Sequence, residues 1–306
     1  MFEAWNGSID HKVPCPIVVI PNHFYSPFLD AIEKAAVIDR GTIIASDFNL
    51  MQRAQTADEA IQLLMQPMHH KAPGTQFTLR EKMIYLRHEL GRGLSAVSNL
   101  PPAVVFMGSK KGLLRTDAEV KFAEELALTI LAATSFGIRF GVHNLIDEVI
   151  TSRAEKILNS NGTRKDVIQR ILMTDEIATQ TNGETQTELN NLHIDAHFGS
   201  RVAQKETLIH NAVAAFFIPG DIPTLDVLFA LVCEIQTGRR QRIPVFLVGC
   251  EFWQPIIDGL KESLKGEYDG QFINYIDLDI MTIIGTSPED VRLALDAVNS
   301  AMRTSE

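Results

Sequence analysis

The segment "AFFIPGDIPTLDVLFAL", residues 215–231, carries the residues best suited to chemistry. An apolar run ends at Gly220, and an amphipathic helix is predicted to begin near Thr224. A strand, a glycine turn and a helix start typically form an anion site, because free backbone N–H groups and the helix dipole point at the turn. This turn, however, contains Asp221, whose charge repels an anion, and Pro223, which lacks an N–H. The segment therefore indicates either a phosphate site or the remains of one.

The position of Asp221 favours the second interpretation. Its side chain lies three residues before Thr224 and can cap the N–H groups at the helix start. Pro223 falls in the first turn of that helix, where a missing N–H costs little. We therefore predict a phosphate loop closed from within, with a carboxylate where the phosphate of a ligand would lie.

Alternating strands and helices after residue 98 must position this turn. The alternation predicts an α/β fold with a doubly wound, mainly parallel Rossmann-like sheet, and ligands bind such sheets at the carboxyl ends of the strands. The predicted strands are 103–109, 137–142, 192–198, 212–219, 243–249 and 281–286. The predicted helices are 116–134, opened by a capping box of Thr116 and Glu119, then 145–158, 165–173, 201–210, one from about 224, 253–264 and 287–302.

Residues 1–98 are predicted to form a smaller N-terminal α/β domain of unknown role, and residues 99–306 the Rossmann-like domain. The boundary is placed at "SNLPP", residues 98–102, since proline marks a break in regular structure. Within the first domain we expect strands at 15–21 and 41–48 and helices at 28–38, 56–66 and 78–97.

Composition excludes several function classes. The 306 residues include 28 basic and 38 acidic side chains, a net charge of -10, which argues against nucleic acid as a partner. The three cysteines are too few for a disulfide framework and fit a reducing cytoplasm. No apolar run approaches the roughly 20 residues that span a membrane. We expect a cytoplasmic protein with no cofactor and no membrane partner.

Two further clusters are candidate ligand sites. Gly108 and Ser109 end the strand 103–109, where a small turn lets backbone approach an anion; a tight turn without a ligand is the alternative. His193, Asp195 and His197 alternate along a predicted strand and share one face, which suits a metal. No further ligands accompany them, so a polar strand end is favoured and no metal site is expected.

Four segments in order resemble one known family. They are "VVFMGSKKG", "FGIRFGVHNLIDEVITSRA", "SRVAQKETLIHNAVAAFFIPG" and "PGDIPTLDVLFALVCEIQTGRRQRIPVFLVGCEFWQPIIDGL". Together they are similar to the LOG ("Lonely Guy") nucleotide phosphoribohydrolases, long mislabelled lysine decarboxylases, whose superfamily includes the nucleotide 5'-monophosphate nucleosidases. The resemblance covers about residues 100–300. It implies a homodimer that binds a nucleotide or other small molecule, with ligand contacts at Gly108, Ser109, Gly141, Gly220, Asp221 and Thr224.

The departures from the family's pattern fall on its chemistry. The family's PGGxGTxxE signature holds the nucleotide phosphate and supplies a catalytic glutamate. Here the second glycine is Asp221, the third is Pro223, and the glutamate position is Val227. The family's catalytic arginine is Gln204, although Lys205 is kept. Valine cannot transfer a proton, and the four departures together predict a pseudoenzyme whose phosphoribohydrolase activity is lost.

Three side chains remain candidates for a surviving catalytic role. Asp226 adjoins the missing glutamate, although a helix turns it about a hundred degrees away from residue 227, and it also suits a first-turn acid. Arg201 lies one turn before Gln204, or is a solvated helix-face arginine. With Lys205 they leave open an active nucleoside 5'-monophosphate phosphoribohydrolase. A third possibility is an uncharged or cationic ligand, which would tolerate Asp221.

Overall fold

The computed structural model describes residues 17–20, 25–65, 79–98, 100–109, 112–114, 116–141, 145–161, 168–173, 193–198, 200–264 and 278–305. Its strands are β1 (Ile17–Val19), β2 (Met51–Arg53), β3 (Ala103–Met107), β4 (Gly137–Phe140), β5 (Ile168–Met173), β6 (His193–Phe198), β7 (Ala212–Phe217), β8 (Val245–Val248) and β9 (Met281–Ile284). Its helices are α2 (Ser26–Ile32), the π-helix η1 (Glu33–Asp39), α3 (Ala45–Phe48), α4 (Ala57–Leu64), α5 (Leu79–Ser98), α6 (Ala118–Ala133), α7 (Leu145–Asn161), α9 (Arg201–Ile209), α10 (Ile222–Gln236), α11 (Cys250–Leu264) and α13 (Pro288–Ser305).

A seven-stranded sheet forms the centre of the molecule. Its strands follow the order β6-β5-β4-β3-β7-β8-β9, and each adjacent pair is parallel. The predicted α/β, doubly wound, Rossmann-like fold is confirmed. The chain runs outward from β3 to β6, then returns to place β7 beside β3. This reversal of strand order makes the carboxyl ends of β3 and β7 the expected ligand crevice.

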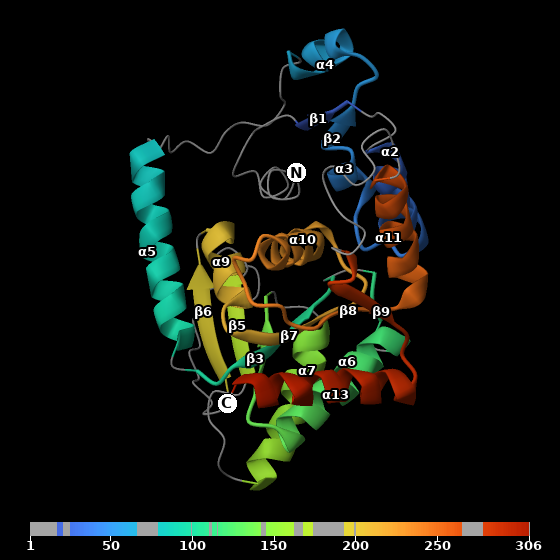
Figure 1. Ribbon diagram of the computed structural model, residues 1–306. Helices are drawn as coiled ribbons and strands as arrows, with labels where there is room; N and C mark the ends of the chain where they lie inside the picture. The colour runs from blue at the N-terminus through green and yellow to red at the C-terminus, as the bar shows by residue number, and fades with distance from the viewer. Residues whose placement is uncertain are drawn as a thin grey trace.

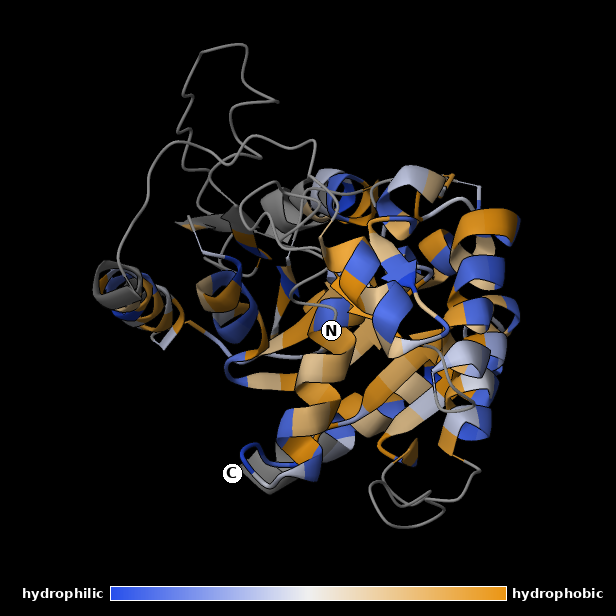
Figure 2. Cartoon of the chain, turned by 90° about the horizontal axis from the view of Figure 1, so that it is seen from above, coloured by the Kyte–Doolittle hydropathy of each residue, from blue (hydrophilic) through white to orange (hydrophobic). Residues whose placement is uncertain are grey.

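Helices cover both faces of this sheet (Figure 1). Helices α6, α7 and α13 lie on one face, and α5, α9, α10 and α11 on the other. Because side chains alternate along a strand, β3 contributes Val104 and Phe106 to the first core and Val105 and Met107 to the second. Figure 2 shows the resulting pattern, with hydrophobic residues through the central strands and polar residues on the outer helix surfaces.

A row of phenylalanine rings crosses four neighbouring strands. Phe106 stacks on Phe216 at a centroid distance of 5.1 Å, and Phe216 stacks on Phe246 at 5.0 Å. Phe140 adds a tilted ring at 6.3 Å from Phe106. The strand register places each ring opposite the next, so the parallel pairing itself aligns them. This row fixes β3 beside β7 just below their carboxyl ends.

The N-terminal elements pack directly against the helices of the sheet. Strands β1 and β2 form a separate parallel pair, and α2 lies alongside α11 (Figure 1). A Cβ on Gly259 of α11 would approach the Ala31 Cβ to 2.6 Å, so glycine permits this close contact. The Phe28 backbone N–H donates to Ser263 Oγ at 3.2 Å. One buried apolar cluster therefore extends from α2 into the sheet. The domain boundary between residues 98 and 99 stays a prediction.

The predicted strand at residues 41–48 is wrong. The segment forms a turn followed by α3, and Met51–Arg53 is the strand that pairs with β1. Ile43 and Phe48 are both buried, and they lie five residues apart. An extended strand would point them to opposite faces, whereas a turn and one helical turn bring both into a single core.

The predicted helix at residues 165–173 is also wrong, because residues 168–173 form the strand β5. Ile168 and Ile171 are both buried, but in the cores on opposite faces of the sheet. A spacing of three residues fits one face of a helix as well as two faces of a strand, so the pattern alone was ambiguous. The segment is a strand because it pairs with β4 on one side and with β6 on the other.

Candidate functional site

The turns after β3 and β7 meet at the carboxyl edge of the sheet. The Ser109 N–H donates to the Pro219 carbonyl at 3.2 Å, which joins the two turns. Ser109 is fully buried, and its Oγ donates to the Thr42 carbonyl at 3.4 Å. A Cβ on Gly108 would lie 2.5 Å from Ile218 Cγ1, so only glycine fits there. The structure thus uses Gly108 and Ser109 to join three segments, and their role as ligand contacts stays a prediction.

Asp221 caps α10 as predicted. Its Oδ1 accepts from the Thr224 N–H at 3.2 Å and from Thr224 Oγ1 at 2.9 Å, and Pro223 lies in the first helical turn. Gly220 is buried against the Thr224 side chain, where any Cβ would clash. The predicted cap is confirmed, and it is a carboxylate that occupies the helix start.

The environment of Asp221 raises the pKa of its carboxyl group above the ordinary value of 3.8. Burial is the largest cause, and the hydrogen bonds from Thr224 and the positive charge of Arg201 act in the opposite direction. Arg201 lies at the start of α9, so α9 and α10 bring these two candidate residues close enough to interact.

We expect the charge of Asp221 to make stability depend on pH. The folded protein holds this proton more tightly than the unfolded chain, so the contribution is favourable below the unfolded pKa and is lost as pH rises through the folded pKa. The Asp221→Asn variant keeps an oxygen acceptor for the cap but does not titrate. In urea unfolding between about pH 4 and 8, the free energy of unfolding of the variant should increase relative to that of the wild type as pH rises.

Removal of the cap provides the matched control. Asp221→Ala should lower the free energy of unfolding by about 1 to 2 kcal/mol, whereas Asp221→Asn should lower it far less. A pH-independent difference between Asp221 and its Asn variant would contradict the raised pKa. Equal costs for Ala and Asn would contradict the capping role.

Lys205 and Asp226 form a buried ion pair between α9 and α10. Lys205 Nζ lies 3.2 Å from Asp226 Oδ1, and each side chain is about a tenth exposed. The structure therefore brings together two residues that the sequence singled out separately. Val227, at the family's glutamate position, is instead buried in the apolar core.

Gln204, at the family's arginine position, binds backbone rather than facing a crevice. Its Nε2 donates to the Gly141 carbonyl at 2.6 Å and to the Ile171 carbonyl at 2.8 Å. Gly141 follows β4 and Ile171 belongs to β5, so the Gln204 amide links α9 to two neighbouring strands. A Cβ on Gly141 would lie 2.7 Å from Leu208 Cδ2, which leaves no space for a side chain.

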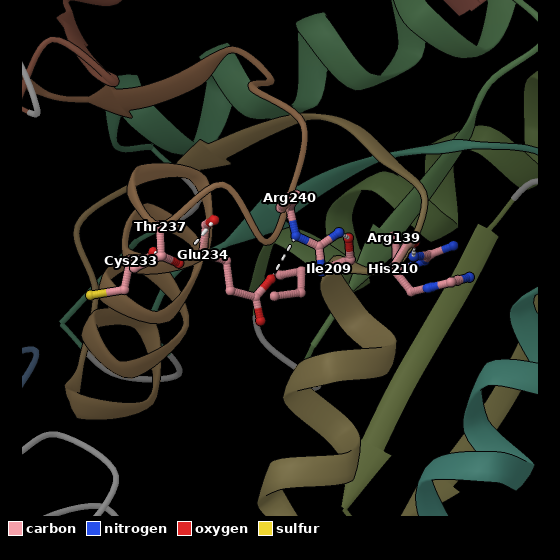
Figure 3. A network of polar contacts seen from close by, with 7 residues as sticks. All are labelled: Arg139, Ile209, His210, Cys233, Glu234, Thr237 and Arg240. Atoms are coloured by element: carbon pink, nitrogen blue, oxygen red, sulfur yellow. Dashed lines mark hydrogen bonds and ion pairs between the residues drawn. The ribbon is translucent and has the colours of Figure 1, made fainter.

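Two arginines fix the far end of α9 (Figure 3). Arg139 of β4 is fully buried; its Nη1 donates to the carbonyls of Thr207 at 3.2 Å, Leu208 at 3.1 Å and His210, and its Nε donates to Gln169 Oε1 at 2.8 Å. Burial, and then the charge of Arg240, lower the pKa of Arg139 to about 10.

Arg240 completes this anchor from the segment after α10. It donates from Nη1 to the Ile209 carbonyl and from Nε to Glu234 Oε2, each at 2.7 Å. Cations at a helix C-terminus stabilise its dipole. The position of Arg201, Gln204 and Lys205 along α9 thus depends on a polar network at the opposite end of the same helix.

Sequence reasoning missed a contribution from the N-terminal region. Arg40, after η1, pairs with Glu119 and lies 4.0 Å from Asp117 Oδ2 at the start of α6. The predicted capping box is wrong, because Asp117 rather than Thr116 is the N-cap residue and Glu119 binds Arg40. No local signal in the sequence could have paired residues 79 positions apart.

Other candidates are only partly described. Residues 193–198 form β6, but the side chains of His193, Asp195 and His197 lie outside the described set. Among the described residues, no group of three His, Cys, Asp or Glu side chains is placed to hold a metal. The described helices likewise include none that is both long and apolar enough to cross a membrane.

Comparison with known proteins finds a family match for part of the chain. Residues 150–293 match the family described as "Possible lysine decarboxylase", the LOG-like family that the four segments resemble. The matched segment is a LOG-like domain. This LOG-like segment runs from α7 into α13 and includes Gln204, Lys205 and the 219–227 turn, while β3 and β4 lie before it. A search of curated proteins finds no match to the chain.

Proposed function

We propose that the chain is a nucleotide- or small-molecule-binding pseudoenzyme that has the LOG-like fold without phosphoribohydrolase activity. The observation that carries this proposal is the bond from Thr224 N–H to Asp221 Oδ1. By the resemblance, that N–H belongs to the group that holds the nucleotide phosphate. Its partner here is a carboxylate of the protein itself.

The charges that could support hydrolysis are also engaged. Lys205 and Asp226 neutralise each other at 3.2 Å in a nearly buried position. The Gln204 amide is bound to two backbone carbonyls, and Val227 lies in the core. Cleavage of an N-glycosidic bond needs a carboxylate to stabilise the positive charge that develops on the sugar. Of the two carboxylates described at this turn, Asp221 caps α10 and Asp226 is paired with Lys205.

The charge of Asp221 favours an uncharged or cationic ligand over an anionic one. An anionic phosphate about 4 Å from an ionised Asp221 would lose on the order of 4 kcal/mol at an effective dielectric constant near 20. An uncharged nucleoside or a cationic small molecule avoids this repulsion. We therefore propose that nucleosides bind better than their 5'-monophosphates. We also propose a homodimer, from the resemblance alone, and a cytoplasmic location, from the cysteine content.

One observation favours a second candidate function. Asp226 is buried on the same helix turn as the family's glutamate position and has a lysine within 3.2 Å. A buried acid beside a lysine is a recurring arrangement in proton transfer. The alternative is therefore an active nucleoside 5'-monophosphate phosphoribohydrolase that uses Asp226 and releases the base and ribose 5-phosphate.

A base-release assay separates the two functions. Purified protein incubated with AMP, GMP, CMP, UMP and IMP should release no free base detectable by chromatography. Turnover that disappears in Asp226→Ala would overturn the pseudoenzyme proposal and establish the alternative. In calorimetric titrations, adenosine should bind more tightly than AMP, and Asp221→Asn should raise the affinity for AMP tenfold or more. Equal AMP affinity in both proteins would contradict the role given to Asp221.

A further inference from the structure

A turn at residues 40–42, which we call the N-terminal turn, lies against the end of β3. The Thr42 carbonyl accepts from Ser109 Oγ at 3.4 Å, and Thr42 itself is buried. The Ile43 N–H and Thr42 Oγ1 both donate to the Ala36 carbonyl, at 3.0 and 3.3 Å, and so hold the turn closed onto η1. The N-terminal turn is thus a built structure that contacts the expected ligand crevice.

The loop after β3 fits closely around this turn. Gly112 has a φ of +73°, and a Cβ there would lie 2.5 Å from the Arg40 carbonyl oxygen and 3.0 Å from the Thr42 nitrogen. Gly41 also has a positive φ, of 61°. A Cβ on Gly41 would meet no atom within 4 Å, so Gly112 is the glycine that lets the two backbones approach closely.

An ion pair fastens the contact. The Arg40 side chain is a quarter exposed and pairs with Glu119, whose side chain is 8% exposed. Glu119 in turn lies close to the end of β8, since a Cβ on Gly249 would be 3.0 Å from Glu119 Oε1. A partly buried pair of this kind is screened less by water than a surface pair. Arg40 thus connects the N-terminal turn to the start of α6 and the edge of the sheet.

We propose that the N-terminal turn is a cover over the crevice between β3 and β7, fastened by the pair of Arg40 and Glu119. A ligand reaches Gly108 and Ser109 only when this cover opens. The N-terminal region thereby controls access to the site. The identity of the ligand rests on the proposed function, but the cover itself can be tested without a ligand.

Hydrogen exchange without ligand provides that test. In Arg40→Met, peptides that contain Gly108 and Ser109 should exchange at least tenfold faster than in the wild type, because the cover opens more often. Arg53→Met is the matched control, since Arg53 pairs with Asp30 and Glu33 inside the N-terminal region. In Arg53→Met, the exchange rate of those peptides should stay within twofold of the wild-type rate. The charge-reversed double variant Arg40→Glu with Glu119→Arg should exchange more slowly than Arg40→Glu alone, with incomplete restoration because the new carboxylate at position 40 lies near Asp117.

Binding of adenosine provides the second readout. Binding must supply the free energy that opens the cover. Because this free energy is smaller in Arg40→Met, the variant should bind adenosine about three to ten times more tightly. Unchanged exchange at Gly108 and Ser109 in a folded Arg40→Met protein would overturn the cover, as would equal acceleration in Arg53→Met. Faster exchange in Arg40→Met alone, without adenosine binding to any variant, would support the cover and contradict the proposed ligand class.

Discussion

Replacement of Arg139 by methionine should lower the free energy of unfolding by about 3 to 5 kcal/mol. The side chain is fully buried and supplies hydrogen bonds to three carbonyls at the end of α9 and to Gln169. Methionine fills similar space but leaves these buried acceptors unpaired, and each unpaired group costs on the order of 1 to 3 kcal/mol. Urea denaturation followed by circular dichroism measures the change.

Arg153 provides the matched control, because it pairs with Glu124 at 3.0 Å but is 61% exposed. Arg153→Met should change stability by about 0.5 kcal/mol or less. If Arg139→Met does not accumulate as folded protein, Arg139→Lys should still fold with an intermediate loss, since lysine keeps the charge but not the fork of donors. A loss below about 1 kcal/mol in Arg139→Met would contradict the anchoring role.

Replacement of Phe216 by alanine should also lower the free energy of unfolding by about 3 to 5 kcal/mol. Phe216 is fully buried in β7 and stacks between Phe106 and Phe246. Truncation leaves a cavity in the core and removes two ring contacts, each worth about 0.5 to 1.5 kcal/mol beyond burial. Thermal and urea unfolding of the variant measure the loss.

Phe216→Leu tests which part of that loss comes from the rings. Leucine keeps most of the volume, so the cavity is small and the cost should fall to about 1 to 2 kcal/mol. Equal losses for Ala and Leu would show that stacking, rather than the cavity, dominates. A loss under 1 kcal/mol in Phe216→Ala would contradict the role of the phenylalanine row.

Local patterns predicted those parts of the fold that depend on neighbouring residues. The buried strands β3, β7 and β8 are continuous apolar runs, as expected for a parallel sheet covered on both faces. The cap of Asp221 on Thr224 involves residues three apart, so the sequence alone predicted it. Residues 168–173 were assigned wrongly because their two flanking strands, not their own spacing, determine their conformation.

Long-range contacts in the candidate site could not be read from the sequence. Asp226 and Lys205 were singled out separately, but their pairing depends on how α9 packs beside α10. Gln204 was recognised as a departure from the family's arginine, whereas its bonds to the Gly141 and Ile171 carbonyls depend on two strands far along the chain. The contact of Thr42 with Ser109 spans 67 residues and leaves no periodic signal.

The contact of α2 with α11 has a consequence for how the protein is made. Phe28 and Ser263 are 235 residues apart, so the apolar face of α2 leaves the ribosome long before its partner exists. At about 5 to 20 residues per second, synthesis of the intervening chain takes roughly 10 to 50 seconds. During this interval Phe28, Leu29 and Ile32, all buried in the finished molecule, are exposed to other nascent chains. Helix α2 is therefore synthesised early but packs against α11 late, and chaperone binding should concentrate on it.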